Sequence, residues 1–426
     1  MVSAKPGAYV WYVSVILALA YTLSYLDRQL PFILTESIKA DLSLSDTQLG
    51  LLTGAMFSLV YCTMAFPIAS IADRYSRKWL IAGSVFTWSG VTALGGLSQN
   101  FLQLSASRIG VAIGEAGCIP ASHSMIADYF TPRFRARAMS IFHSASATGI
   151  VLGLGLGGLI NEMANWRMAM ILLGAPGLLL TVLIIFTVRE PKRAQPPPTA
   201  TAAGTAPATL METLRRLVKH PTFRHLMIAG ILQAITSAGL QAFAPSYAIR
   251  TFGLDSAQVG LTYGLCMGVT GIVGTLIGGQ VADRLRRRRP SDALVFAGLG
   301  MLASAPCFFI ALSSHSYWVF VAMLGVATMT SHFYVAAAFT TMQSLAEPRM
   351  HAKTTAIYLF ALSGVGAAVG PLVVGMMSDW LIAAGSANSL RVALLVALIP
   401  KAWAGVHYFL AARGLNRSSE GAPVTQ

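Results

Sequence analysis

The sequence predicts an all-α membrane protein with twelve transmembrane helices in two six-helix bundles. Two observations carry this prediction. Of the 426 residues, 55% are hydrophobic and 11% are charged, whereas soluble domains carry about 25% charged residues. Apolar stretches of about 20 residues also recur from end to end, and each is long enough to cross a bilayer core of about 30 Å as a helix.

A repeated pattern in the sequence predicts the two bundles. The segment Ala72-Asp73-Arg74 closes an apolar stretch and returns about 210 residues later as Ala282-Asp283-Arg284. The segment Thr131-Pro132-Arg133 returns in the same way as Glu347-Pro348-Arg349. Because both pairs join apolar stretches at nearly the same offset, they indicate two halves repeated in one orientation.

The apolar stretches define the predicted helices and domains. We expect helices near 10–34, 47–72, 79–98, 101–129, 138–161, 167–188, 223–250, 257–282, 292–313, 316–345, 354–380 and 389–411. The predicted domains are an N-terminal bundle at 1–190, a cytoplasmic linker at 191–222, and a C-terminal bundle with a short cytoplasmic tail at 223–426. The linker contains Pro196-Pro197-Pro198, and its residues 210–220 have the apolar spacing and basic face of a short helix on the membrane surface.

The net charge of +14 is an orientation signal. Most of the 30 Lys and Arg residues fall in loops on the side shared by both termini, whereas the opposite loops hold Lys39, Arg167, Arg250 and Arg391. The positive-inside rule therefore predicts cytoplasmic termini, which places a bacterial protein in the inner membrane. The same distribution argues against a nucleic-acid partner.

Charged residues inside the predicted helices indicate the functional site. Asp27 and Arg28 lie in the first helix, and Arg108 and Glu115 lie two turns apart on one face of the fourth. Charges at membrane depth are costly and usually face a cavity or one another. We expect one cavity-lining column of two acids and two arginines; the alternative is a static ion network. Lys401, in the last helix, has no explanation from the sequence.

The second half has no matching charges at the corresponding positions. Its candidate substrate contacts are polar or aromatic: Ser237, Gln241, His332 and Tyr334. One charged wall and one mostly apolar wall suit an amphiphilic substrate.

The repeated loops provide candidate gating residues: Asp73, Arg74, Arg77, Asp283 and Arg284. The four cysteines show no paired spacing, so neither a disulfide framework nor a metal site is expected. No nucleotide-binding loop or catalytic set is evident either. We therefore expect no enzyme activity and no cofactor.

The chain resembles the major facilitator superfamily in its Asp-Arg loops after the second and eighth helices, its glycine-rich fifth and eleventh helices, and its twelve-helix layout. Tyr25-Leu26-Asp27-Arg28, the segment from Arg108 to Glu115, and Pro120-Ala121 resemble the spinster family. That resemblance implies a lysophospholipid or sphingoid-phosphate type of substrate. It also implies that Asp27 and Glu115 are the protonatable pair, with Arg28 and Arg108 as their charge partners or headgroup ligands.

These observations predict a monomeric secondary transporter that moves a lipid-like anionic or zwitterionic substrate by alternating access, coupled to protons. The alternatives are a facilitator or multidrug-type exporter of small organic anions, and a lipid-binding receptor that does not transport. Because Asp27 adjoins Arg28 and matches the depth of Arg108, we expect it to have more positive charge nearby. Glu115 is then the carboxyl that titrates nearer neutral pH.

Overall fold

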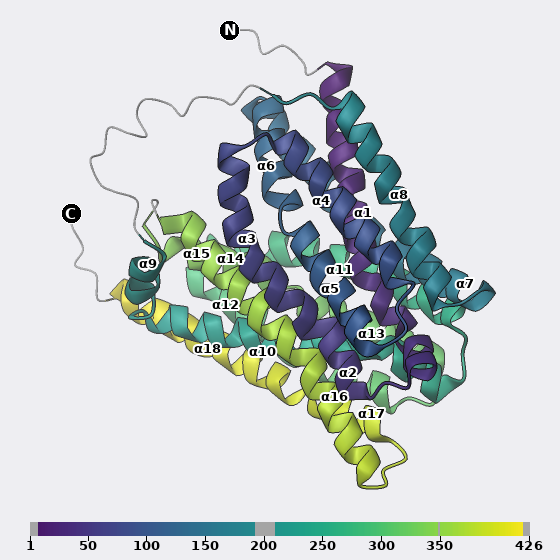
Figure 1. The fold of residues 1–426 in the computed structure, drawn as a ribbon. Helices are drawn as coiled ribbons and strands as arrows, with labels where there is room; N and C mark the ends of the chain where they lie inside the picture. Colours follow the sequence, from purple (N-terminus) through teal and green to yellow (C-terminus); the bar gives the residue numbers. More distant parts are fainter. Residues whose placement is uncertain (1–6, 192–208, 348–349, 421–426) are drawn as a thin grey trace. The chain divides into compact units, whose positions relative to one another are not determined.

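The structure, a computed structural model, describes residues 7–191, 209–347 and 350–420, without the side chains of residues 66, 69, 70, 72–74, 352 and 417–420 (Figure 1). Every regular element in this described part is helical. By its contacts the chain forms two compact units. Unit 1 is Met1–Gly204 with Ala248–Gly268, and unit 2 is Thr205–Tyr247 with Val269–Gln426.

Unit 1 contains the first eight α-helices and one π-helix. They are α1 (Ala8–Leu42), α2 (Asp46–Gly50), η1 (Leu51–Ala55), α3 (Met56–Arg74), α4 (Arg77–Gly95), α5 (Phe101–Glu115), α6 (Cys118–Tyr129), α7 (Pro132–Met163) and α8 (Trp166–Thr187). Asn100 begins α5 by accepting a hydrogen bond from the Gln103 backbone N–H, and Asn165 begins α8 in the same way through Met168.

Unit 2 contains the remaining helices, while α10 and α11 contribute residues to both units. They are α9 (Leu210–Leu217), α10 (Pro221–Phe252), α11 (Ser256–Arg286), α12 (Pro290–Ser313), α13 (Tyr317–Ser331), α14 (Tyr334–Ser344), α15 (His351–Leu359), η4 (Phe360–Gly366), α16 (Ala367–Ala383), α17 (Ser389–Val396) and α18 (Ile399–Glu420). The helix α9 lies in the stretch 210–220, where the sequence predicts a short helix. Most of the predicted linker lies outside the described residues.

Ten helical segments in the described part are long and apolar enough to cross a membrane. The two other predicted spans, 79–98 and 101–129, correspond to α4 and to the α5–α6 pair. Polar residues such as Ser84, Ser89 and Thr92 lower the mean hydropathy of α4, but all three side chains are buried. The α5–α6 pair is divided into helices of 15 and 12 residues.

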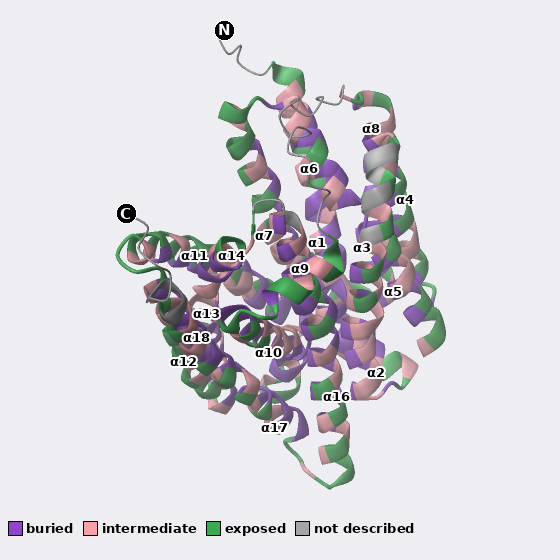
Figure 2. Ribbon diagram, turned by 90° about the vertical axis from the view of Figure 1, so that its left-hand side faces the viewer, coloured by how far each residue is buried: buried purple, intermediate pink, exposed green. Residues whose placement is uncertain are grey.

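Many large apolar side chains are exposed. Buried and exposed residues alternate around individual helices (Figure 2). On α8, for example, Leu179 is 75% exposed and Phe186 is 81% exposed. Soluble monomers rarely expose apolar surface on this scale, so these faces suit contact with lipid.

Five predicted helices are interrupted, at 47–72, 101–129, 316–345, 354–380 and 389–411. Proline explains two of the breaks, because it has no N–H to donate to the carbonyl four residues earlier. Pro120 cannot donate to the carbonyl of Ala116 between α5 and α6, and Pro400 cannot donate to that of Val396 between α17 and α18. The α5–α6 break at 116–117 and the α13–α14 break at 332–333 stand about 216 residues apart, so the repeat extends to the interruptions.

Glycines bring α7 close to α1, the helix that carries Asp27. A Cβ atom on Gly149 would lie 2.5 Å from the Thr22 carbonyl oxygen, and one on Gly153 would lie 2.7 Å from that of Leu26. Only glycine allows the two backbones to approach this closely. The glycine-rich fifth predicted span, 138–161, therefore packs closely against the first.

Candidate functional site

The buried carboxylate of Glu115 forms the centre of the candidate site in unit 1. Its side chain is 0% exposed, at the last residue of α5. One oxygen, Oε2, accepts hydrogen bonds from Arg28 Nε at 2.5 Å and from Ser24 Oγ at 2.8 Å. The other, Oε1, has no hydrogen-bond partner among the described residues. This carboxylate is therefore neutralised by one arginine and retains one open acceptor.

Arg28 joins this carboxylate to an aromatic cluster. Its guanidinium carbon lies 4.4 Å from the ring centroid of Tyr61, 5.2 Å from that of Phe57 and 5.3 Å from that of Tyr25. Such contacts attract a cation to the ring face. The Nη2 atom of Arg28 is buried and has no hydrogen-bond partner in the described part of the chain. The guanidinium therefore holds Glu115 while keeping donors available for a further anionic oxygen.

Arg108 is buried without an ion pair. It is 3% exposed, and its guanidinium carbon lies 5.1 Å from the Phe57 ring centroid. No carboxylate of a described residue lies within 4.0 Å of it, and its Nε has no partner among those residues. It also lines a small apolar pocket that includes Pro31 and Thr35. Arg108 is thus a buried cation beside a small apolar pocket.

Asp27 is buried without an ion pair as well. It is 2% exposed, and its Oδ2 accepts a hydrogen bond from Thr92 Oγ1 at 3.2 Å. Its Oδ1 has no partner, and no cation of a described residue lies within 4.0 Å. The expectation that Asp27 has more positive charge nearby than Glu115 is therefore wrong, because Arg28 pairs with Glu115. Neighbouring residues on a helix point about 100° apart, so Arg28 is directed away from Asp27 and toward Glu115.

The predicted contacts of the second half all lie in unit 2. Ser237 Oγ accepts a hydrogen bond from Gln233 Nε2 at 2.8 Å, and both residues lie on α10 together with half-buried Gln241. His332 stands at the α13–α14 break, where its Nδ1 is 2.8 Å from the Thr328 carbonyl oxygen. Tyr334 begins α14, with its ring centroid 6.1 Å from that of Tyr408. In the described part, Ser237, His332 and Tyr334 share no hydrogen bond or ring contact with one another.

Lys401 is the residue that the sequence left unexplained. It is 0% exposed at the start of α18, and its Nζ donates a hydrogen bond to Gln233 Oε1 at 2.8 Å. The Phe308 ring centroid lies 4.9 Å from Nζ. No carboxylate of a described residue lies within 4.0 Å. A lysine directly after an intramembrane proline was the only sequence signal for this contact.

Among the predicted gating residues, Arg77 is the best connected. It is 1% exposed and pairs with Asp128 and, at 2.9 Å, with Glu190. Glu190 also accepts hydrogen bonds from Ser76 and from the Lys78 backbone N–H. Burial opposes ionisation of Glu190, but these hydrogen bonds hold its pKa below the usual range.

The other predicted gating residues lie on α3 and α11. The side chains of Asp73 and Arg74 lie outside the described residues, although both residues belong to α3. Asp283 and Arg284 are exposed near the end of α11.

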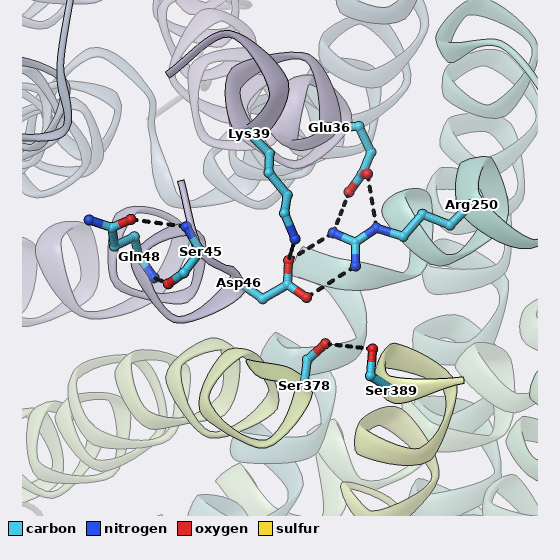
Figure 3. Close-up of polar contacts among 8 residues, drawn as sticks. All are labelled: Glu36, Lys39, Ser45, Asp46, Gln48, Arg250, Ser378 and Ser389. Atoms are coloured by element: carbon cyan, nitrogen blue, oxygen red, sulfur yellow. Dashed lines mark hydrogen bonds and ion pairs between the residues drawn. The ribbon is translucent and has the colours of Figure 1, made fainter. Parts of the chain in front are cut away.

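A second ionic network stands at the end of unit 1 where α1 ends (Figure 3). Arg250 donates to Glu36 at 2.8 and 2.9 Å and to Asp46 at 2.8 and 3.0 Å. Lys39 pairs with Asp46 as well, and the Asp46 side chain is 0% exposed. The sequence reasoning missed this network, because it treated Lys39 and Arg250 only as orientation charges.

These geometries define what the site can do chemically. It offers buried carboxyls that can exchange a proton and arginines that can bind an anionic group. Among the described residues, no group of three or more His, Cys, Asp or Glu side chains could hold a metal ion.

Comparisons with known proteins place these features in a family. The family model of the Major Facilitator Superfamily matches residues 17–415. An MFS-type efflux pump of Mycolicibacterium smegmatis is 34% identical over 415 residues, which cover 96% of this chain and 94% of the pump. Protein spinster homolog 1 of Homo sapiens is 28% identical over 378 residues, which cover 84% of this chain and 71% of that protein.

A solved structure is also similar over nearly the whole chain. It is the crystal structure of a bacterial homolog to the human lysosomal transporter Spinster, in an inward-facing and unoccupied conformation. The two chains superpose with a TM-score of 0.86 at 29% identity, covering 97% of this chain and 99% of that chain.

Proposed function

The chain belongs to the Major Facilitator Superfamily and is an integral, multi-pass membrane transporter, and from this premise we propose that it moves an amphiphilic anion or zwitterion coupled to protons. Transporters of this superfamily bind small-molecule substrates. The proposed substrate is a lysophospholipid or a sphingoid phosphate. The similarity to spinster proteins supports this class.

The proposal rests on one observation: of two buried carboxyls, one is paired with a cation and the other is not. Glu115 is neutralised by Arg28, whereas Asp27 is neutralised by no cation of a described residue. A carboxyl buried without a cation is costly in its charged form and binds a proton instead. We therefore propose that Asp27 carries the proton in the described state. The sequence had suggested Glu115 instead.

Substrate binding would then involve the second carboxyl. An anionic headgroup that reaches the free Arg28 donors competes with Glu115 for the same guanidinium. A carboxylate that loses its arginine takes up a proton more readily, because only its charged form was stabilised by the pair. Exchange of Glu115 for substrate on Arg28 thereby links anion binding to proton binding. Arg108, which has no ion pair and borders a pocket, is the second proposed headgroup ligand.

We further propose the organisation predicted from the sequence: a monomer with bundles at 1–190 and 223–426, an inner-membrane location if bacterial, and both termini in the cytoplasm. Asp73, Arg74, Arg77, Asp283 and Arg284 are proposed to hold the cytoplasmic side closed. Asp73→Asn is expected to increase cysteine labelling from the cytoplasmic side. Equal labelling of the variant and the parent on both faces contradicts a gate.

The deciding experiment is uptake in proteoliposomes with and without an imposed pH gradient. Radiolabelled lysophosphatidylglycerol and sphingosine phosphate are the substrates, and protein-free vesicles are the control. Accumulation that depends on the gradient supports the proposal. Binding without uptake indicates a receptor, and uptake that ignores the gradient indicates a facilitator.

A second candidate function rests on one specific similarity. The relative with 34% identity is named an MFS-type efflux pump. Export of small organic anions would use the same arginines without a lipid chain. Transport of a fluorescent organic anion that lysophosphatidylglycerol does not inhibit would favour this candidate.

A further inference from the structure

A three-residue chain of hydrogen bonds in unit 2 has a fixed direction. Lys401 Nζ donates to Gln233 Oε1 at 2.8 Å, and Gln233 Nε2 donates to Ser237 Oγ at 2.8 Å. Lys401 is the donor in the first contact, and its protonated form, which has three donors and no acceptor, allows only the amide oxygen of Gln233 to face it. The amide nitrogen must then face Ser237, whose oxygen accepts. Every donor in this chain therefore points from Lys401 toward Ser237.

The direction leaves the Ser237 hydroxyl hydrogen as the open end. A hydroxyl can accept and donate at the same time. In the described part of the chain, no acceptor receives a hydrogen bond from Ser237 Oγ. The adjacent hydroxyl of Thr236, in contrast, donates to the carbonyl oxygens of Leu232 and Ala397. Ser237 is half-buried, whereas Gln233 is 4% exposed and Lys401 is 0% exposed. The accessible end of the chain is thus a donor.

Lys401 gives this donor its charge in the protonated form, which an approaching anion favours. The break between α17 and α18 sets the lysine against α10, and Thr236 supports the break by donating to the Ala397 carbonyl oxygen at 2.8 Å. No carboxylate of a described residue balances the ammonium within 4.0 Å. Hydrogen bonds in a chain polarise one another, and a buried cation at one end strengthens the donor at the other. An unbalanced buried cation also favours any anion that approaches.

We propose that Ser237 is a specificity-determining ligand contact that binds an anionic oxygen, phosphate or carboxylate, through a hydrogen-bond relay charged by Lys401. The relay rejects an amine at the same place, because a second donor would face the Ser237 hydroxyl and the lysine charge. This inference rests on the proposed function for its amphiphilic substrate, and it adds a contact in unit 2 that recognises the sign of the headgroup.

Binding to the purified full-length chain in dodecyl maltoside tests the relay without requiring transport. The probes are dodecyl phosphate, dodecylamine and dodecanol, measured by isothermal titration calorimetry. The parent protein is expected to prefer dodecyl phosphate. Lys401→Met, Gln233→Leu and Ser237→Ala should each weaken dodecyl phosphate binding about tenfold, the strength of a charge-assisted hydrogen bond, and leave dodecanol binding unchanged.

Two further variants separate the relay from simple packing. The double variant Ser237→Ala with Lys401→Met should bind dodecyl phosphate no more weakly than either single variant, because both cut the same chain. Ser304→Ala is the matched control, since this buried hydroxyl of unit 2 already donates to the Met301 carbonyl oxygen at 2.7 Å. It should leave the ratio of phosphate to dodecanol affinity unchanged.

The inference is overturned if the parent protein shows no preference for dodecyl phosphate, if Gln233→Leu keeps full affinity, or if all probes weaken equally. It is also overturned if the two single losses add in the double variant. Gradient-driven uptake that persists after such a result leaves the proposed function standing. If the variants give the expected binding results but the protein shows no gradient-driven uptake, only the proposed function is contradicted.

Discussion

The buried charges of Glu115 in unit 1 and Lys401 in unit 2 are balanced in different ways. Glu115 has a charged partner, Arg28, together with the Ser24 hydroxyl. Lys401 has a neutral partner, the Gln233 amide. A buried charge with an ion-pair partner is destabilised when that partner is removed. A buried charge without a partner is stabilised when a ligand of opposite charge binds. Unit 1 thus contains an ion pair, Arg28 with Glu115, that a ligand could break. Unit 2 contains a lysine, Lys401, that a ligand could still pair with.

The largest expected effect comes from the carboxyl that lacks a cation. Asp27→Asn should abolish the response of uptake to a pH gradient, lowering accumulation about tenfold or more, while exchange of substrate across the membrane persists. The physical reason is that asparagine keeps the hydrogen bonding of a protonated Asp27 but cannot release a proton. Counterflow and gradient-driven uptake in the same vesicles measure the two properties.

Glu115→Gln should reduce gradient-driven uptake as well, but it should also impair exchange because Arg28 loses its counter-charge. If both variants keep full gradient-driven accumulation, the carboxyls do not carry the proton and a facilitator becomes the better description.

Stability measurements test the comparison directly. Glu115→Gln should destabilise the protein by about 3–5 kcal/mol, because it leaves the Arg28 charge buried without its partner. Lys401→Met should change stability by about 1 kcal/mol or less, since it removes a cation that no carboxylate balances and leaves one amide oxygen unpaired. Thermal unfolding in detergent ranks the two variants. The reverse order would mean that Lys401 has a counter-charge in the folded protein.

Arg108→Lys should produce an intermediate effect on binding. Arginine can hold a phosphate through two parallel hydrogen bonds, whereas lysine acts as a point charge. Affinity for lysophosphatidic acid should fall by about fivefold, and affinity for an uncharged monoacylglycerol should stay the same. Equal losses for both ligands would leave Arg108 with a structural role only.

The smallest effect is expected where charges are paired near water. Burial raises the Glu190 pKa, but hydrogen bonds from the Lys78 backbone N–H, Ser76 and Arg77 outweigh burial and hold this pKa below its usual range. These contacts therefore stabilise the folded state above the unfolded pKa of about 4.3. That contribution is lost as the pH falls through the lower folded value. Glu190→Gln should therefore lower the unfolding temperature by about 2 °C at pH 7. The difference from the parent should shrink as the pH falls below about 4.3 and through the folded pKa. A difference that grows toward acid pH would contradict this account.

The all-helical fold could be predicted from the sequence because apolar length and repeated loops are local signals. The positions at which the helices are interrupted were harder to predict from the sequence. Pro120 and Pro400 are visible in the sequence, but prolines also occur inside unbroken helices here, such as Pro31 in α1 and Pro176 in α8. Tertiary packing decides which proline ends a helix.

The four charges in the first half could be predicted to belong together, but not which acid contacts which arginine. Because Asp27 and Arg28 are adjacent in the sequence, they were expected to lie close to each other. Their side chains point in different directions on the helix, and Arg28 contacts Glu115 instead. The contact of Lys401 could not be predicted, because its partner Gln233 lies 168 residues earlier on α10 and no sequence pattern marks it. A contact between distant helices leaves no pattern in one sequence.

The π-helices η1 (Leu51–Ala55) and η4 (Phe360–Gly366) have a practical consequence for experiments that substitute or label this chain residue by residue. A π-turn accommodates an extra residue, so the side chains beyond it are rotated by about 100° from the phase set before it. A labelling pattern measured along α2 therefore cannot be extrapolated into α3, nor one from α15 into α16. The same extra residue means that η1 and η4 could each absorb a one-residue deletion by relaxing to an ordinary α-helix.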